Sequence, residues 1–100
     1  GVRHIFEVSQ PAACLCDELG INVNMAGKIA ESSISSAAVL HISAAAPSLK
    51  WGLSITTQYA GADLVRNPIV IDAGEAILPD SAGLGVEVDE DAVQAFAVSA

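Results

Sequence analysis

The chain has 100 residues, of which 52% are hydrophobic and 16% charged, and its formal net charge is −8. Nucleic acids and anionic membranes attract proteins through clustered Lys and Arg, so this charge and four scattered basic residues exclude both as expected partners. A small free-standing domain needs more polar cover than this, whereas parallel α/β folds bury both their helices and their strands, so the composition indicates part of a larger α/β protein.

The first predicted element is a helix that ends at Gly20, the usual position for a glycine after a helix. Pro11 leaves two alternatives. Either a long helix is kinked at Pro11, or Ser9 caps a shorter helix from about Pro11 to Leu19. The helix is indicated by apolar residues that recur at intervals of three and four, namely Ile5, Val8, Ala12, Leu15, Cys16 and Leu19.

Two short β runs, residues 21–25 (INVNM) and 50–56 (KWGLSIT), flank a second predicted helix. Ser32 or Ser33 can cap this helix, which runs to about Ala46. It is apolar nearly all round, which predicts packing on more than one side. The order helix, strand, helix, strand with short links is typical of βα repeats, so we expect a parallel sheet.

The segment 63–67 is a short helical turn at best, and we place a domain boundary near Asn67. Beyond it the sequence predicts a β run, a turn at Gly74, a second β run, a turn at residues 83–85, a third β run and a helix. Acidic residues 89–91 stand at the start of that helix, where attraction to the helix dipole explains them without a metal.

No stretch is long enough to span a bilayer, because the most apolar run, residues 34–46, is too short and contains His41. His41 is expected to be a hydrogen-bonded core residue. Cys14 and Cys16 lie two apart in a helical pattern, where they point in different directions and do not pair. Without a signal peptide, a reducing, cytoplasmic location is expected.

The tail (Pro68 to Val93), the segment GKIAESSI at residues 27–34 and the pair Trp51-Gly52 together resemble the carboxyl-terminal end of the mandelate racemase and muconate-lactonizing enzymes, a branch of the enolase superfamily. The resemblance implies an α/β fold, the carboxyl-terminal part of a TIM-like (β/α)7β barrel. Residues 1–67 would form its sixth helix, seventh strand, seventh helix and eighth strand. Residues 68–100 would add strands and a helix to the capping domain.

The resemblance also implies an activity for the complete enzyme. In that family a Lys or His removes the proton next to a substrate carboxylate, and Mg²⁺ bound to carboxylates stabilises the enediolate. Those lysines and metal ligands would precede this segment, which holds no certain catalytic residue and no metal ligand. The expected function is a racemase, epimerase or cycloisomerase of a small carboxylic or amino-acid derivative, in an enzyme that is a homo-oligomer. A dehydratase on the same scaffold is the alternative, and a non-catalytic α/β interaction module is the alternative of another class.

Active sites of such barrels lie at the carboxyl ends of the strands, which makes four residues candidates for substrate binding. Lys28, just past the first β run, is either a ligand of the substrate carboxylate or a solvated loop lysine. Glu31 either orients Lys28 or a hydroxyl, or stabilises the amino end of the following helix. Gly27 stands where some relatives place a catalytic His.

At the second β run, Ser54 occupies a position that is acidic in several relatives. This departure moves polar recognition onto the hydroxyls of Ser54 and Thr56, followed by Thr57 and Gln58. The alternative for Ser54 is a side chain that fills the barrel interior.

Overall fold

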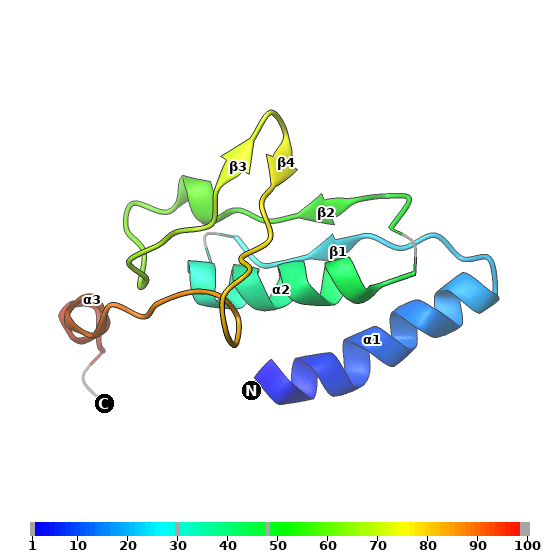
Figure 1. Cartoon of the computed structure of the whole chain (residues 1–100), viewed down its shortest axis with the longest axis horizontal. Helices are drawn as coiled ribbons and strands as arrows, with labels where there is room; N and C mark the ends of the chain where they lie inside the picture. The colour runs from blue at the N-terminus through cyan, green and yellow to red at the C-terminus, as the bar shows by residue number, and fades with distance from the viewer. Residues whose placement is uncertain (1, 30, 48, 99–100) are drawn as a thin grey trace.

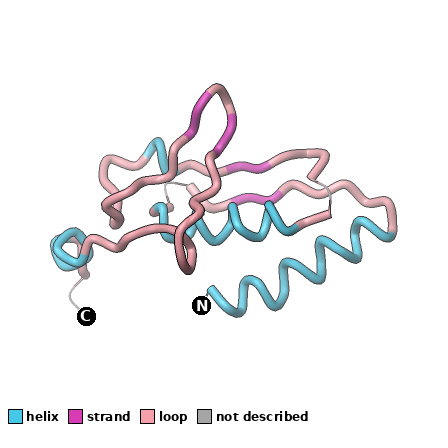
Figure 2. The backbone as a smooth tube through the Cα atoms, in the orientation of Figure 1, coloured by secondary structure: helices cyan, strands magenta, loops and turns pink. Residues whose placement is uncertain are grey.

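The computed structural model describes residues 2–29, 31–47 and 49–98, and side chains from Phe6 onward (Figure 1). The side chains of His4 and Ile5 lie outside the described residues. Much of the chain is loop, and the strands are short (Figure 2). The elements are α1 (Val2–Glu18), β1 (Met25–Ala26), α2 (Ser33–Ala45), β2 (Leu53–Ser54), a 3₁₀ turn η1 (Thr57–Tyr59), β3 (Ile71–Asp72), β4 (Glu75–Ala76) and α3 (Glu90–Ala95).

Strands β1 and β2 pair in parallel, with Met25 opposite Leu53 and Ala26 opposite Ser54. Helix α2 connects them and lies along one side of the pair (Figure 1). This βαβ unit confirms the predicted parallel pairing. Regular pairing between β1 and β2 covers only two residues of each strand, so both strands are shorter than the β runs that the sequence predicts.

Helix α1 runs without interruption through Pro11, so the longer of the two predicted helices is the one that forms. Gly20 follows it with φ +70°, and the amide of Ile21 donates to the carbonyl of Cys16 at 2.8 Å. This six-residue hydrogen bond closes the helix in the manner predicted for Gly20. The apolar stripe of α1 is largely open to solvent, with Leu15 55% and Leu19 64% exposed.

The core is centred on α2, which packs against both α1 and β1. Its buried residues are Ser33, Ser36, Ala37, Ala38, Leu40 and Ile42. Buried side chains from other segments complete the core, among them Ala13 of α1, Ile55 after β2 and Val65. Burial on several faces of one helix confirms the prediction made from its apolar composition.

Beyond Asn67 the chain forms the hairpin β3–β4, which stands away from the βαβ unit (Figure 1). Its two-residue turn has Ala73 at φ +50° and Gly74 at φ +79°. Two consecutive positive φ angles are typical of the type I′ turn, whose twist matches that of a two-residue hairpin. The turn predicted at Gly74 is therefore confirmed.

The segment 63–67 is not a helical turn, contrary to the sequence prediction. Val65 forms an antiparallel bridge with Val88, and the amides of Arg66 and Asp89 donate to the carbonyls of Glu87 and Leu64, both at 2.8 Å. Pairing with a segment 20 or more residues later overrides the local helical preference. The third β run predicted for the tail contains Val88, so this bridge pairs that run with the segment around Val65.

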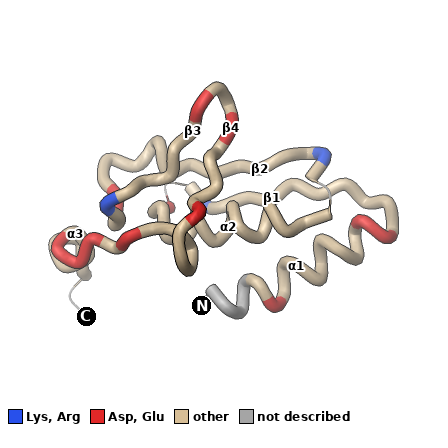
Figure 3. The backbone as a smooth tube through the Cα atoms, in the orientation of Figure 1, with Lys and Arg blue, Asp and Glu red and all other residues tan. Residues whose placement is uncertain are grey.

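The tail carries most of the acidic residues. Residues 68–100 include seven Asp or Glu and neither Lys nor Arg. Figure 3 shows several of these acids along the approach to α3 and on that helix. The Asp89 carboxylate accepts hydrogen bonds from the amides of Asp91 and Ala92, so it caps α3, and Glu90 and Asp91 stand in its first turn.

Candidate active site

The four candidate residues lie where the parallel strands β1 and β2 end. In a parallel pair the carboxyl ends lie at the same edge, so the loops that follow are neighbours. The amide of Gly27, just after β1, donates to the carbonyl of Ser54 at 2.9 Å. Lys28 and Glu31 come from the loop after β1, and Ser54 and Thr56 come from the end of β2.

Lys28 and Thr56 are joined directly. The Thr56 hydroxyl donates to the backbone carbonyl of Lys28 at 2.8 Å. The Lys28 side chain is exposed, and its ammonium has no hydrogen-bond or ion-pair partner among the residues that the structure describes. Thr56 therefore fixes the backbone from which this cation projects.

Ser54 is exposed, whereas Leu53, whose side chain points to the other face of β2, is half-buried. Its hydroxyl oxygen accepts from the Asn24 amide nitrogen at 3.4 Å. The same nitrogen lies 3.1 Å from the carbonyl oxygen of Trp51 and 3.0 Å from that of Gly52. Asn24, which precedes β1, is thus a hydrogen-bond partner of Ser54 that the sequence prediction missed, because its partners are 27 to 30 residues away and no local pattern marks it.

Glu31 is half-buried and its carboxylate lies close to Gly27. A Cβ added to Gly27 would lie 2.8 Å from Glu31 Oε2, so the glycine leaves room for the carboxylate beside the end of β1. No ion pair joins Glu31 to Lys28 in the described part of the chain, so the proposed orientation of Lys28 by Glu31 stays a prediction.

Helix α2 begins at Ser33, so the predicted position of the cap at Ser32 is confirmed, but the hydroxyl does not do the capping. Ser32 occupies the N-cap position, but its side chain makes no capping hydrogen bond. Instead the Asp63 carboxylate accepts from the amide of Ser33 at 2.9 Å and from the Ser33 hydroxyl. A carboxylate is a stronger acceptor than a hydroxyl, and it also interacts favourably with the positive end of the helix.

Two other candidate groups lie away from this edge. His41 is half-buried, and its Nε2 lies 2.8 Å from the carbonyl oxygen of Leu84. Because a carbonyl can only accept, Nε2 carries the proton. His41 is thus the hydrogen-bonded residue that the sequence predicts. Cys14 and Cys16 are half-buried and both are free thiols.

The described residues do not provide a divalent metal site. They contain no group of three or more His, Cys, Asp or Glu placed to hold an ion. The described residues therefore do not fit the role of a complete Mg²⁺ ligand set.

A groove of about 740 Å³ runs beside β2, between residues 53–59 and the hairpin. Four consecutive residues, 53–56, line it together with Gln58, Tyr59 and residues of β3 and β4. Successive side chains of a strand point to opposite faces, so a groove lined by a consecutive run follows the edge of the strand. It lies along the edge of β2 that does not pair with β1.

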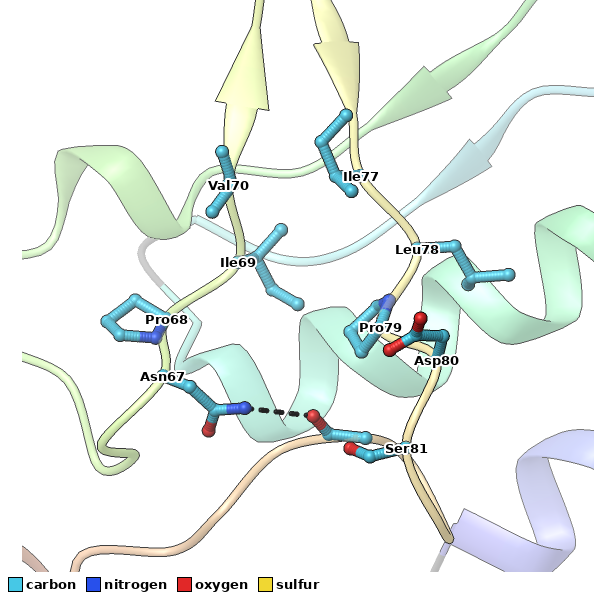
Figure 4. A pocket seen from close by; sticks show the side chains of 10 residues that line it. Asn67, Pro68, Ile69, Val70, Ile77, Leu78, Pro79, Asp80 and Ser81 are labelled. Carbon is cyan, nitrogen blue, oxygen red and sulfur yellow. Dashed lines mark hydrogen bonds between the residues drawn. The ribbon is translucent and has the colours of Figure 1, made fainter.

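A smaller cavity of about 280 Å³ lies within the tail, between the two chain segments that enter and leave the hairpin (Figure 4). Ile69, Val70 and Ile77 give it an apolar lining. The Asn67 side chain closes one side by donating to the carbonyl of Gly85 at 3.0 Å. None of the four candidate residues lines this cavity, so it is separate from the carboxyl edge of β1 and β2.

None of the helices among the described residues combines the length and hydropathy that crossing a bilayer requires.

Comparison with known proteins identifies relatives across most of the chain. The model of the enolase C-terminal domain-like family matches residues 6–92. Chloromuconate cycloisomerase of Cupriavidus necator is 32% identical over 85 residues, which are 84% of this chain and 23% of that protein. Muconate cycloisomerase 1-1 of Acinetobacter lwoffii is 28% identical over 89 residues, 88% of this chain and 23% of that protein. The chain spans less than a quarter of the length of these curated relatives.

Solved structures show the same fold. Muconate lactonizing enzyme from Klebsiella pneumoniae superposes with a TM-score of 0.76 at 27% identity, over 85% of this chain and 24% of that one. An isomerase from Streptomyces coelicolor superposes with a TM-score of 0.81 at 25% identity, over 91% of this chain and 24% of that one. An enolase from Gibberella zeae, complexed with magnesium, formate and sulfate, superposes with a TM-score of 0.79 at 26% identity. The match covers 91% of this chain and 22% of that one. These likenesses support the α/β barrel type of fold.

Proposed function

We propose a function for this chain from its family and from the geometry of its site. The chain belongs to the enolase C-terminal domain-like family, in the mandelate racemase and muconate-lactonizing branch of the enolase superfamily. It forms the carboxyl-terminal part of a longer barrel enzyme. That enzyme abstracts a proton next to the carboxylate of a small acid. The observation that carries the proposal is the convergence of Lys28, Ser54 and Thr56 at the carboxyl edge of two parallel strands, where barrel enzymes place their sites.

In this proposal α1 is the sixth helix of the barrel, β1 the seventh strand, α2 the seventh helix and β2 the eighth strand. Residues 1–67 belong to the barrel and residues 68–100 to the capping domain. Two features support the assignment. The groove along the open edge of β2 leaves room for another strand, and the exposed apolar stripe of α1 offers a surface for a neighbouring helix.

Each candidate side chain has a separate role. The Lys28 ammonium binds the substrate carboxylate, which is the charge-assisted contact that fixes the acid in place. Ser54 accepts from Asn24, which directs its own hydroxyl hydrogen toward an acceptor on the substrate. Thr56 holds the Lys28 backbone, and Glu31, beside Gly27, provides a hydrogen-bond acceptor at the same edge.

The group that removes the proton and the ligands of Mg²⁺ belong, in this proposal, to parts of the enzyme outside these 100 residues. A proton next to a carboxylate is very weakly acidic, so the enzyme must stabilise the negative charge that develops when it leaves. A bound Mg²⁺ supplies that stabilisation. The residues of this chain bind and orient the acid.

The names of the curated relatives favour an isomerase, because both are cycloisomerases. A dehydratase of a hydroxy acid is the second candidate, since the same proton abstraction followed by loss of water would use the same edge. The enzyme would work in the cytoplasm, where Cys14 and Cys16 remain reduced.

The test uses the complete enzyme and measures incorporation of solvent deuterium next to the carboxylate of candidate acids. Lys28→Ala should lower kcat/KM by about 10- to 100-fold, mainly through KM, because it removes a charged hydrogen bond worth about 1.5–3 kcal/mol. Lys50→Ala is the matched control: Lys50 is also exposed, but it precedes β2 and lies at the opposite edge of the strand pair. Equal kinetics for the Lys28 and Lys50 variants would remove Lys28 from the site.

A second pair of variants isolates Glu31. Gly27→Ala places a methyl group against the Glu31 carboxylate, which can move away because it is the end of a flexible side chain. We therefore expect Gly27→Ala to leave stability nearly unchanged and to reproduce the kinetic effect of Glu31→Gln. If Gly27→Ala is fully active while Glu31→Gln is not, the placement of the carboxylate beside Gly27 is irrelevant to the reaction.

A further inference from the structure

Ser33 and Asp63 form a node that ties three separate segments together. The Asp63 carboxylate accepts from the amide of Ser33 at 2.9 Å, from the Ser33 hydroxyl and from the amide of Leu64 at 2.7 Å. The Ser33 hydroxyl oxygen in turn accepts from the amide of Ile69 at 3.1 Å. The start of α2, the exit from β2 and the beginning of the tail therefore meet at two side chains.

The node is partly buried, and both of its side chains are hydrogen-bonded. Ser33 is 0% exposed and Asp63 is half-buried. Asp63 has no cationic partner in the part of the chain that the structure describes, so three hydrogen-bond donors and the amino end of α2 balance its charge. A buried polar cluster that is fully satisfied favours a single arrangement of the segments it joins.

The segment most affected is the loop between β1 and α2, which carries both Lys28 and Glu31 and of which the structure describes residues 27–29, 31 and 32. The amide of Gly27 holds one end of this loop to Ser54, and Thr56 holds Lys28. The other end is Ser33 itself. Without the Asp63 contacts the Ile69 amide would still donate to the Ser33 hydroxyl, but the far end of the loop would lose its carboxylate partner and could shift together with the first turn of α2.

We propose that Asp63 is a positioning residue for the substrate site: acting through Ser33, it holds the loop between β1 and α2 so that Lys28 meets the substrate carboxylate. This inference rests on the proposed function. Asp63 does not contact the substrate. Because Ile69 donates to the same hydroxyl, the node also sets the position of the tail relative to the site loop.

The test is a double-mutant cycle in the complete enzyme. Asp63→Ala should raise KM about tenfold with a smaller effect on kcat. The same substitution should have almost no further effect when Lys28 is already alanine, because its action passes through Lys28. Asp63→Asn keeps an oxygen that can accept from the Ser33 amide but loses the second carboxylate oxygen, so it should recover part of the affinity. Asp80→Ala, which removes an exposed carboxylate from the tail, should match the parent enzyme.

Hydrogen exchange supplies a readout that does not depend on activity. Asp63→Ala should speed amide exchange of residues 27–33 about tenfold while residues 71–76 of the hairpin remain as in the parent protein. If Asp63→Ala unfolds the protein, which faster exchange in the hairpin would reveal, the milder Ser33→Ala and Asp63→Asn variants take its place in both measurements.

Three results would overturn the inference. The first is unchanged exchange in residues 27–33. The second is faster exchange with unchanged KM, which would make the node purely structural. The third is additive effects of the Asp63 and Lys28 substitutions, which would show that Asp63 does not act through Lys28. If the parent enzyme fails to exchange the α-proton of any tested acid while loop exchange responds as expected, the proposed function fails instead.

Discussion

Gly85 is held by its backbone conformation and by a close neighbour. Its φ is +77°, and a Cβ there would overlap the Pro79 side chain. We expect Gly85→Ala to lower the free energy of unfolding by about 1–2 kcal/mol from the left-handed conformation, with a further loss from the overlap. A urea titration of the complete protein measures this.

Gly61→Ala is the control for Gly85→Ala. Gly61 is exposed, its φ lies outside the left-handed region, and nothing lies within 4 Å of a Cβ added there. Its substitution should change the free energy of unfolding by less than about 0.5 kcal/mol. Equal effects at the two glycines would show that the turn tolerates a side chain at Gly85.

Single residues show where sequence reasoning succeeds and where it ends. The turn positions of Gly20 and Gly74 follow from local preferences, and the structure confirms both. Asn24 and Asp63 were missed, because their hydrogen bonds cross 27 to 30 residues of chain. A capping carboxylate that comes from another segment leaves no local pattern, so Ser32 and Ser33 were the only visible candidates for a cap.

Besides Ser33, which accepts from the amide of Ile69, helix α2 holds the tail through His41, which donates to the carbonyl of Leu84. His41→Ala removes this hydrogen bond, worth about 0.5–1.5 kcal/mol, and should speed amide exchange of residues 83–86 roughly two- to tenfold. Exchange in α2 itself should change little. The measurement is hydrogen exchange followed by mass spectrometry.

Ser43→Ala is the matched control on the same helix. The Ser43 hydroxyl donates to the carbonyl of Val39 within α2, at 2.7 Å, and does not contact the tail. Its loss should leave exchange of residues 83–86 at the parent rate. A response to Ser43→Ala as large as that to His41→Ala would mean that the turn reports general loosening of α2.

At the level of elements, periodicity predicted the helices better than the strands. The apolar spacing of α1 and the all-round apolar surface of α2 identified both helices, and Gly20 set the end of the first. The β runs were predicted as five and seven residues, whereas β1 and β2 pair over two each. Strand length depends on neighbouring strands, which the sequence of one strand does not encode.

The molecule as a whole exposes apolar surface that a monomeric domain would bury. Val8, Leu15, Leu19 and Ile21 are all more than half exposed on or beside α1. We expect the 100-residue chain, produced alone, to self-associate, because exposed apolar area of this kind drives association. Light scattering coupled to size exclusion measures the mass. A monomer of 10.1 kDa that unfolds cooperatively would instead favour the non-catalytic module.

The position of Asp63 also affects when α2 can be completed during synthesis. The helix starts at Ser33, but the carboxylate that caps it is 30 residues later in the chain. At roughly 5–20 residues per second, a ribosome needs about 1.5–6 s to add those residues. During that interval the first turn of the nascent helix lacks its acceptor. The amino end of α2 is therefore completed late, together with the exit from β2.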